Sequence, residues 1–273
     1  MIAPGGPTLT AKSDPCPGVE VYFPTLDAAV DTITVWRTAD GVTEAVAGAL
    51  RATAAGDFVV DDWQVPFGVV STYSGEVFDI NGASLLGAQS AIQVESADVW
   101  MQAQVDPSES FIVDLQPGSF TGIGRQRRTQ QVFVAGISRP FEQNWGLSAI
   151  SGMPFNVLTQ GDQQAAALVS LLEASPLLIR TPPKFTTIPR LLSASVKQPS
   201  QDPLDWNRTT LNWIVWTLTV DEVQPFSKAI LRPLITWDDW AAAFPAGSYT
   251  WDDVMAVYGA GTWTDAVRNP PNA

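Results

Sequence analysis

Histidine is absent from the 273 residues of this chain, and cysteine occurs once, as Cys16. Without histidine, Ser-His-Asp and Cys-His nucleophile systems and every His-ligated zinc site are excluded. A single cysteine excludes an intramolecular disulfide and any multi-cysteine metal site. A Walker loop and a Gly-x-Gly-x-x-Gly sequence opening a helix are also missing. What remains for catalysis is paired carboxylates, Ser-Lys arrangements or carboxylate-bound Mg²⁺ or Ca²⁺. We predict no catalytic residues, no cofactor and no metal site, and expect that the protein is not an enzyme.

Long apolar runs are absent as well. No stretch of about 18 apolar residues is available to cross a membrane. The first residues, Met-Ile-Ala-Pro-Gly-Gly, have neither the basic nor the apolar region of a signal peptide. Charged residues are scarce, at 16 %, whereas hydrophobic residues make up 45 %. This composition favours folded domains with apolar cores. Because a signal peptide is not recognised, we expect synthesis in a cytoplasm without export by a cleaved signal.

Basic residues are few, and the net charge of −13 is unevenly distributed. Residues 1–95 carry 3 basic and 12 acidic side chains, residues 96–235 carry 11 of each, and residues 236–273 carry 1 and 5. An acidic surface repels phosphate backbones, so we expect no nucleic-acid partner. Arg125, Arg127 and Arg128 form one basic run in the neutral middle. They are either a solvated hairpin tip or a contact to an acidic face of a neighbouring subunit.

The length suggests two domains, and 41 Gly and Pro residues favour many turns and short strands. We predict a mainly β protein with an extended arm at 1–17 and a first β domain at 18–95. A second β-rich domain is predicted at 96–235, and a helical docking tail at 236–273.

The first domain has strand patterns that begin at Val19 and continue through residues 33–37 and 58–60. A hairpin turn is predicted at Asp40-Gly41. The order of Pro66-Phe67-Gly68, Tyr73 and Asn81-Gly82 resembles the last strands of a fibronectin type III β-sandwich. This resemblance implies a strand-F tyrosine at Tyr73 and a hairpin at Asn81-Gly82, with Trp36 as a core aromatic. A generic β-sandwich has the same architecture.

The second domain combines strand patterns with one helix. Strands are predicted near residues 111–113, 131–135 and 211–223, the last one central because both of its faces begin apolar. A helix near 162–175 is predicted to be capped by Asp162, and its stripe is Ala165, Ala166, Leu168, Val169, Leu171 and Leu172. A short buried strand follows at residues 177–180. We expect a second β-sandwich-like domain, with Trp213 and Trp216 in its core.

The tail contains the sequence Thr-Trp-x-Asp three times, at 236–239, 250–253 and 262–265. In each unit the threonine and the aspartate can form a capping box, so each unit predicts the start of a short helix. Such short helices are unstable alone and need a surface to cover their aromatic side chains. That surface is either the second domain or a partner. The predicted docking residues are Trp237, Trp240, Trp251, Tyr258 and Trp263.

Three features together resemble the minor tail proteins of actinobacteriophages. They are the opening sandwich, the Thr-Trp-x-Asp tail, and the capped helix that leads into Leu178-Ile179-Arg180-Thr181-Pro182-Pro183. The resemblance implies a structural virion protein of a siphophage, at the distal tail tip or baseplate. It also implies a homo-oligomer, hexameric or trimeric, whose partners are tail-tube, tail-tip hub or fibre subunits. Distal tail proteins usually place their ring-forming β domain first, whereas here the fibronectin-like module leads.

Two other functions compete with this one. A carbohydrate hydrolase would use the carboxylate pairs Asp61/Asp62, Asp238/Asp239 or Asp252/Asp253. Neighbouring residues of a strand point to opposite faces, which disfavours the first pair, and capping explains the other two. A host-surface carbohydrate- or receptor-binding module would use exposed tryptophans, of which Trp63, Trp100 and Trp145 are the candidates.

Overall fold

The structure is a computed structural model that describes residues 1–54, 56–132, 141–174, 176–186, 188–204 and 213–225, with the backbone alone for 126–132, 141–148 and 198. The chain is mainly β, as the sequence predicts. It divides into two compact units, and the main boundary along the sequence follows Glu95. The first unit includes Met1–Glu95 and Val105–Pro107, and the second includes Ser96–Gln104 and continues from Ser108. The predicted tail at 236–273 lies outside the described residues.

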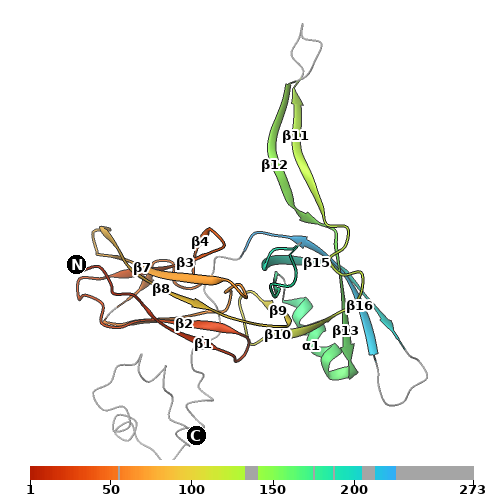
Figure 1. Cartoon of the computed structure of the whole chain (residues 1–273), viewed down its shortest axis with the longest axis horizontal. Helices are drawn as coiled ribbons and strands as arrows, with labels where there is room; N and C mark the ends of the chain where they lie inside the picture. Colours follow the sequence, from red (N-terminus) through yellow and green to blue (C-terminus); the bar gives the residue numbers. More distant parts are fainter. Residues whose placement is uncertain (55, 133–140, 175, 187, 205–212, 226–273) are drawn as a thin grey trace, which may run out of the picture. The chain divides into compact units, whose positions relative to one another are not determined.

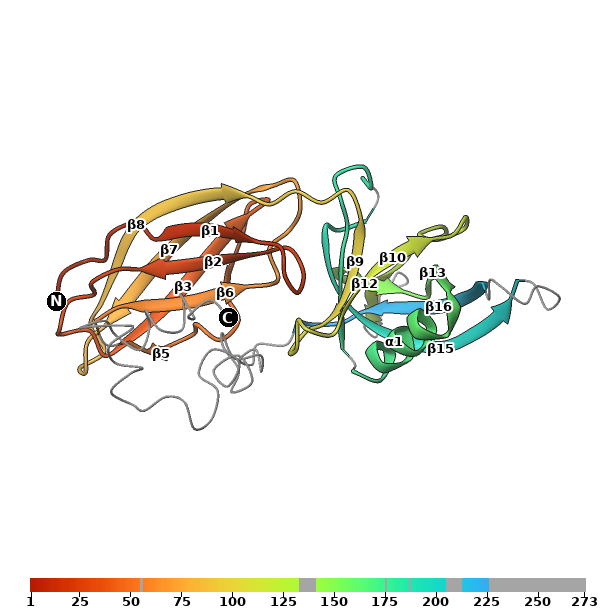
Figure 2. The ribbon, with the colours of Figure 1, turned by 90° about the horizontal axis from the view of Figure 1, so that it is seen from below.

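The first unit is built from antiparallel strands. They are β1 (Thr8–Lys12), β2 (Gly18–Phe23), β3 (Thr32–Ala39), β4 (Val42–Ala45), β5 (Ala52–Thr53), β6 (Phe58–Asp62), β7 (Val70–Phe78) and β8 (Ser84–Gln93). One sheet has the order β1-β2-β6 and the other the order β4-β3-β7-β8, with β5 paired to β3. Figure 2 shows the two sheets as separate layers. The unit is therefore a sandwich.

In the core of the sandwich, a glycine of one sheet packs against an aromatic ring of the other. A Cβ atom at Gly75 on β7 would lie 2.8 Å from the ring of Phe23 on β2, so Phe23 packs at this position because residue 75 has no side chain. Phe23, Phe67 and Tyr73 are all buried. Trp36, expected in the core, is half-buried instead, and its Nε1 donates to Glu76 at 3.0 Å. Trp36 precedes the core-facing Arg37 on β3, so it points to the other side of the sheet.

Two turns of the first unit agree with the sequence. Asp40 and Gly41 have φ values of 49° and 76° and join β3 to β4 as a two-residue hairpin. The predicted turn at Asn81-Gly82 lies between β7 and β8, where Gly82 has a φ of 82°. The predicted arm at 1–17 is only partly an arm, because residues 8–12 form β1 and pair with β2.

The second unit contains the remaining strands and a helix. They are β9 (Val99–Ala103), β10 (Ser110–Leu115), β11 (Gly124–Val132), β12 (Phe141–Ser151), β13 (Met153–Gln160), α1 (Gly161–Glu173), β14 (Leu177–Arg180), β15 (Leu191–Pro203) and β16 (Trp213–Glu222). Six of the strands close into a barrel of order β10-β13-β16-β15-β14-β9. The expectation of a sandwich-like domain was wrong, because β9 pairs with both β10 and β14 and leaves no open edge.

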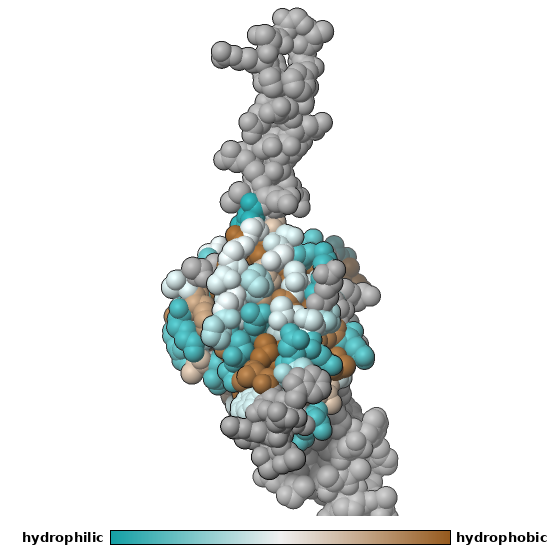
Figure 3. Space-filling model, turned by 90° about the vertical axis from the view of Figure 1, so that its right-hand side faces the viewer, coloured by the Kyte–Doolittle hydropathy of each residue, from teal (hydrophilic) through white to brown (hydrophobic). Residues whose placement is uncertain are grey.

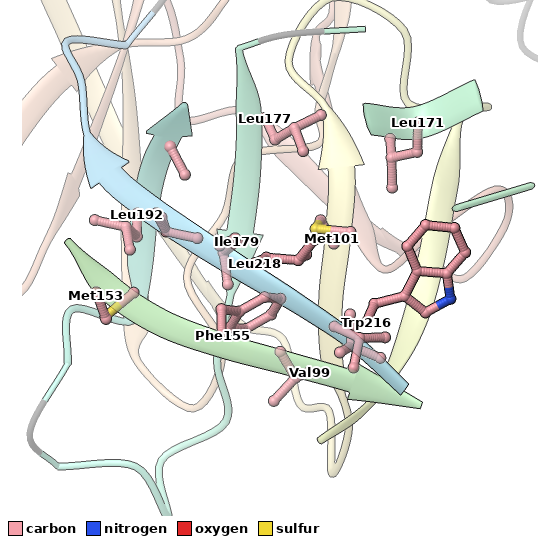
Figure 4. Packing of buried hydrophobic residues seen from close by; sticks show 14 of the residues in the cluster. Val99, Met101, Met153, Phe155, Leu171, Leu177, Ile179, Leu192, Trp216 and Leu218 are labelled. Carbon is pink, nitrogen blue, oxygen red and sulfur yellow. The ribbon is translucent and has the colours of Figure 1, made fainter. Parts of the chain in front are cut away.

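The interior of the barrel is filled by apolar side chains from every strand of the ring. Figure 4 shows Met101, Phe155, Ile179 and Leu218 pointing toward one another. Alternate residues of β16 face this core, as predicted, and Trp216 lies there with its Nε1 donating to Thr159 at 2.9 Å. Trp213, expected in the core, is half-buried. The barrel therefore has a filled interior.

Helix α1 lies against the barrel through Leu168 and Leu171, which are buried. Its apolar stripe is narrower than predicted, since Ala166 and Val169 are exposed. The cap residue is Gln160, whose side chain makes no capping bond, and Asp162 lies within the first turn. The side chain of Gln164 accepts a hydrogen bond from the backbone N–H of Gln160 at 2.7 Å. None of the helices in the described part of the chain has the length and hydrophobicity needed to cross a membrane.

Candidate interaction site

The β11–β12 hairpin is an insertion into the barrel. It connects β10 to β13, which are themselves paired neighbours, so the barrel does not need it for closure. Within the described residues, β11 and β12 form a two-stranded sheet of their own. Figure 1 shows this hairpin leaving the barrel as a twisted ribbon. A two-stranded ribbon is at best marginally stable in water, so its length calls for a surface to pack against.

The Arg run coincides with two irregularities in this ribbon. Arg125 is opposite Ile150, Arg127 is opposite Leu147, and Thr129 is opposite Asn144. Each step of two residues along β11 is matched by three along β12, so β12 contains two bulges. Bulges increase the local right-handed twist and bend a strand. The ribbon therefore turns most strongly beside the predicted basic residues.

Glu222, at the end of β16, holds one side of the base of the hairpin. Its Oε2 accepts from Ile150 N–H at 2.8 Å and lies 3.8 Å from Arg125 Nη2. The Arg125 side chain is 38 % exposed, so this ion pair is weak, and the backbone hydrogen bond is the stronger contact. One carboxylate thus touches both strands of the hairpin.

Asp221, the preceding residue, bonds to the junction at which the chain passes from β12 of the hairpin to β13 of the barrel. Its Oδ1 accepts from Gly152 N–H at 2.7 Å and from Ser151 Oγ at 3.0 Å, and its Oδ2 pairs with Lys197 of β15. The bond from Lys197, followed by that from Gly152, lowers the pKa of the Asp221 carboxyl. Gly152 has a φ of 68°, which favours glycine at the junction of β12 and β13. We call Asp221 and Glu222 the carboxylate clamp.

The predicted docking residues fall into two groups. Arg125 lies at the hairpin base, paired with the clamp, and is therefore not at a hairpin tip. Arg127 and Arg128 follow on β11, where the structure describes their backbone. Trp237, Trp240, Trp251, Tyr258 and Trp263 lie outside the described residues. Sequence reasoning missed the clamp, although an adjacent Asp-Glu pair ending an apolar strand is a visible signal.

The first unit contains a second polar cluster, between its sheets. Asp62 accepts twice from Arg37 Nη1, at 2.8 and 3.0 Å, and from Tyr73 Oη at 2.8 Å. Glu44 accepts from the other nitrogen of Arg37 at 3.0 Å. Burial is the largest single effect on Arg37 and by itself would lower its pKa. The charge interactions with Asp62, Tyr73 and Glu44 and the hydrogen bond to Asp62 together outweigh burial, so the pKa of Arg37 is raised. Asp61 lies on the opposite face of β6, paired with Lys12 at 3.0 Å. These contacts join β-strands and account for both carboxylates.

The tryptophans considered for glycan binding do not form a platform in the described residues. Trp63 is only 5 % exposed and covers Gly18, where an added Cβ would lie 2.4 Å from its ring. Trp100 is half-buried, and its Nε1 donates to Ser96 Oγ at 3.2 Å. The side chain of Trp145 lies outside the described residues. A sugar platform needs an accessible ring face, which Trp63 lacks.

In the described part of the chain, no three acidic or cysteine side chains gather in a way that could hold a metal ion. On the face shown in Figure 3, the coloured surface mixes hydrophilic, neutral and hydrophobic residues. No protein-family model matches the chain, and no curated protein matches its sequence. The hairpin and its clamp are therefore the leading candidate for a functional site.

Proposed function

We propose that this chain is a structural protein of a long-tailed phage virion, a minor tail protein that assembles at the distal tail tip or baseplate. Six or three copies associate with one another and with tail-tube, hub or fibre subunits. The resemblance in the sequence motivates the virion assignment. The observation that carries the assembly role is the anchored hairpin, which leaves a barrel that is already closed.

The anchoring supports an arm with a defined direction. A hairpin that was only a surface loop would need no fixed base, whereas Asp221 and Glu222 bond to three backbone or side-chain groups at residues 150–152. Fixing the base lowers the conformational entropy that is lost when the ribbon packs against a neighbour. The Arg run on β11 would face the acidic surface of that neighbour, since residues 1–95 carry a net charge of −9.

The strand order of the first unit supports its fibronectin type III-like assignment. The fibronectin-like proposal requires two sheets with particular strand orders. The first unit has one sheet of order β1-β2-β6 and another of order β4-β3-β7-β8, as required. Tyr73 lies on β7, the strand that corresponds to strand F. Its hydroxyl donates a hydrogen bond to the Asp62 carboxylate at 2.8 Å. Such a module would decorate the ring domain formed by the barrel.

Shortening the hairpin tests the assembly role. Arg125 and Ile150 are directly paired, so an Asn-Gly turn joining them removes the ribbon and keeps both groups that contact Glu222. We expect native mass spectrometry to show oligomers of the full chain, and monomers of the shortened variant with an unchanged thermal midpoint. The same oligomeric state for the two proteins would refute the proposal that the hairpin is an assembly arm.

Charge reversal tests the acidic partner face. Arg127→Glu should weaken association, and the loss should diminish at high salt, because screening shortens the reach of the charges. Lys184→Glu is the matched control, since Lys184 is an exposed cation of the same unit away from the hairpin. Equal effects of the two substitutions would indicate that net charge alone matters.

The virion assignment has its own test. Peptide mass spectrometry of purified virions from a phage that encodes the chain should detect it, and an antibody against it should label the distal end of the tail. Its absence from virions would refute the proposal. A glycan-binding function has less support, because the ring of Trp63 is buried.

A further inference from the structure

The connection between β7 and β8 contains the one Asn-Gly pair of the sequence, Asn81-Gly82. Both residues of the pair are exposed. Asparagine is thermolabile because the backbone nitrogen of the next residue can attack its side-chain amide. Glycine has no side chain to shield that nitrogen. A Cβ atom built at Gly82 would also meet no described atom within 4 Å, so neighbouring groups do not shield it either.

This pair lies in a turn whose backbone amides are held by Asp79. Gly82 N–H donates to Asp79 O at 3.0 Å. Asn81 N–H and Ala83 N–H donate to Asp79 Oδ1 at 2.9 and 2.8 Å. Gly82 has a φ of 82°, the left-handed conformation that ends a three-residue hairpin loop. One aspartate therefore accepts from three successive backbone amides, with the reactive one in the middle.

The attack requires a movement that this turn opposes. Gly82 N has to approach Asn81 Cγ, which requires rotation about the Cα–C bond of Asn81. That rotation carries Gly82 N–H away from Asp79 O and displaces Ala83 as well. The hydrogen bonds to the Asp79 side chain resist it, because they fix the amides on both sides of the reactive one. The closed turn therefore protects Asn81, and reaction occurs from a locally opened turn.

We propose that Asn81 is a site of spontaneous chemical modification whose rate is set by Asp79. In the opened turn, Gly82 N loses its proton to hydroxide and bonds to Asn81 Cγ. The bond from Cγ to Nδ2 then breaks, and this nitrogen takes up a proton and leaves as ammonia. Water opens the resulting cyclic imide at either carbonyl, which leaves aspartate or isoaspartate at position 81. The net reaction consumes water and releases ammonia.

Either product changes the surface around this turn. Aspartate adds a negative charge close to Asp79. Isoaspartate passes the main chain through the Cβ atom of residue 81, so the ring closed by the hydrogen bond from Gly82 to Asp79 becomes larger. The same turn presents Ile80, which at 86 % has the highest exposure among the exposed large apolar side chains of the described residues. The charge and shape of this surface therefore change as the protein ages.

Asp79→Ala tests the proposal. The substitution removes both side-chain contacts and keeps the Asn81-Gly82 pair. The full chain is incubated at mildly alkaline pH below its thermal midpoint, and peptide mass spectrometry follows amide loss at residue 81, with Asn156 as the internal reference. We expect amide loss about tenfold faster than in the unsubstituted chain. Tenfold corresponds to about 1.4 kcal/mol, which two exposed hydrogen bonds near the lower end of their range supply.

Two control variants isolate the hydrogen bonds. Asp27→Ala removes the same charge from another turn of the first unit, where Asp27 Oδ1 accepts from Ala29 N–H at 2.9 Å. It should leave the rate at Asn81 unchanged. Asp79→Asn removes the charge of Asp79 but keeps an acceptor oxygen at Oδ1. It should react as slowly as the unsubstituted chain.

The remaining outcomes would overturn the proposal. An Asn81 that stays intact in Asp79→Ala would show that it is not a modification site. Equal rates in Asp79→Ala and the unsubstituted chain would remove Asp79 from the mechanism, as would an equal acceleration in Asp27→Ala. If Asp79→Asn reacts as fast as Asp79→Ala, the charge and not the hydrogen bonds protects Asn81.

Discussion

Removing Asp221 from the carboxylate clamp should loosen the base of the hairpin without unfolding the barrel. Asp221→Ala removes three acceptor contacts, from Ser151, Gly152 and Lys197. Each net hydrogen bond contributes about 0.5–1.5 kcal/mol, and partial exposure places these near the lower end. We therefore expect a loss of about 2 kcal/mol, confined to the hairpin base because the barrel core includes none of these groups.

Hydrogen exchange measures this loss where it occurs. A local change of about 2 kcal/mol corresponds to roughly 30-fold faster exchange, since 1.4 kcal/mol is a factor of ten. The amide that loses its acceptor is that of Gly152, which donates to Asp221. The amide of Ile150 donates to Glu222, which stays in place, and its rate reports how far the loosening spreads. Asp202→Ala, at an exposed carboxylate of β15, is the control and should leave both rates unchanged. Unchanged rates in Asp221→Ala would refute the clamp as the anchor of the hairpin.

The same anchor should respond to pH. The pKa of the Asp221 carboxyl is lowered from its ordinary value of 3.8, with the Lys197 hydrogen bond as the largest cause. A lowered pKa means that the contribution to stability is complete above the ordinary value and is lost as the pH falls through the lowered one. Protection of the Gly152 amide, corrected for intrinsic exchange, should therefore fall below about pH 4. In Asp221→Asn this dependence should be absent.

Three further substitutions test the packing, each followed by chemical denaturation of the full chain. Asp62→Ala leaves Arg37 buried without its main partner and should destabilise the first unit by about 3–5 kcal/mol. A loss smaller than about 1 kcal/mol would show that Glu44 alone is enough to balance the charge of Arg37. Tyr73→Phe removes one donor to the same carboxylate and should cost about 1 kcal/mol, more than a matched Tyr22→Phe, whose hydroxyl contact is long at 3.5 Å. Leu168→Ala should destabilise the second unit by about 2–5 kcal/mol and leave the transition of the first unit in place.

Local features were predictable where a pattern depends on neighbouring residues alone. The Asp40-Gly41 hairpin, the position of the helix and the buried strand at 177–180 follow from turn chemistry and periodicity. The helix cap was mispredicted because the helix begins at Gly161, one residue before Asp162, so the cap position falls on Gln160, whose side chain makes no capping bond. Which of two nearby polar residues forms a cap depends on the path of the chain entering the helix.

The candidate site was predictable only in part. Arg125 was identified from its charge, but its partner Glu222 is 97 positions away, and no local pattern relates the two. The pairing arises because β12 returns beside the end of β16. Likewise Arg37, Asp62 and Tyr73 come from three strands and meet between the sheets. The sequence shows the groups, whereas the fold selects their partners.

By itself the sequence determined the mainly β class, the position of the one described helix and the alternation of β16, because each depends on the spacing of apolar residues along a few turns or one strand. Only the tertiary structure decided that six strands close into a barrel, that residues 8–12 form β1, and that the hairpin stands on a carboxylate clamp. A strand in a sandwich and a strand in a barrel both bury one face, so they have the same period. Closure depends on pairing between distant strands, such as β9 with β14, and that pairing leaves no mark in the local pattern.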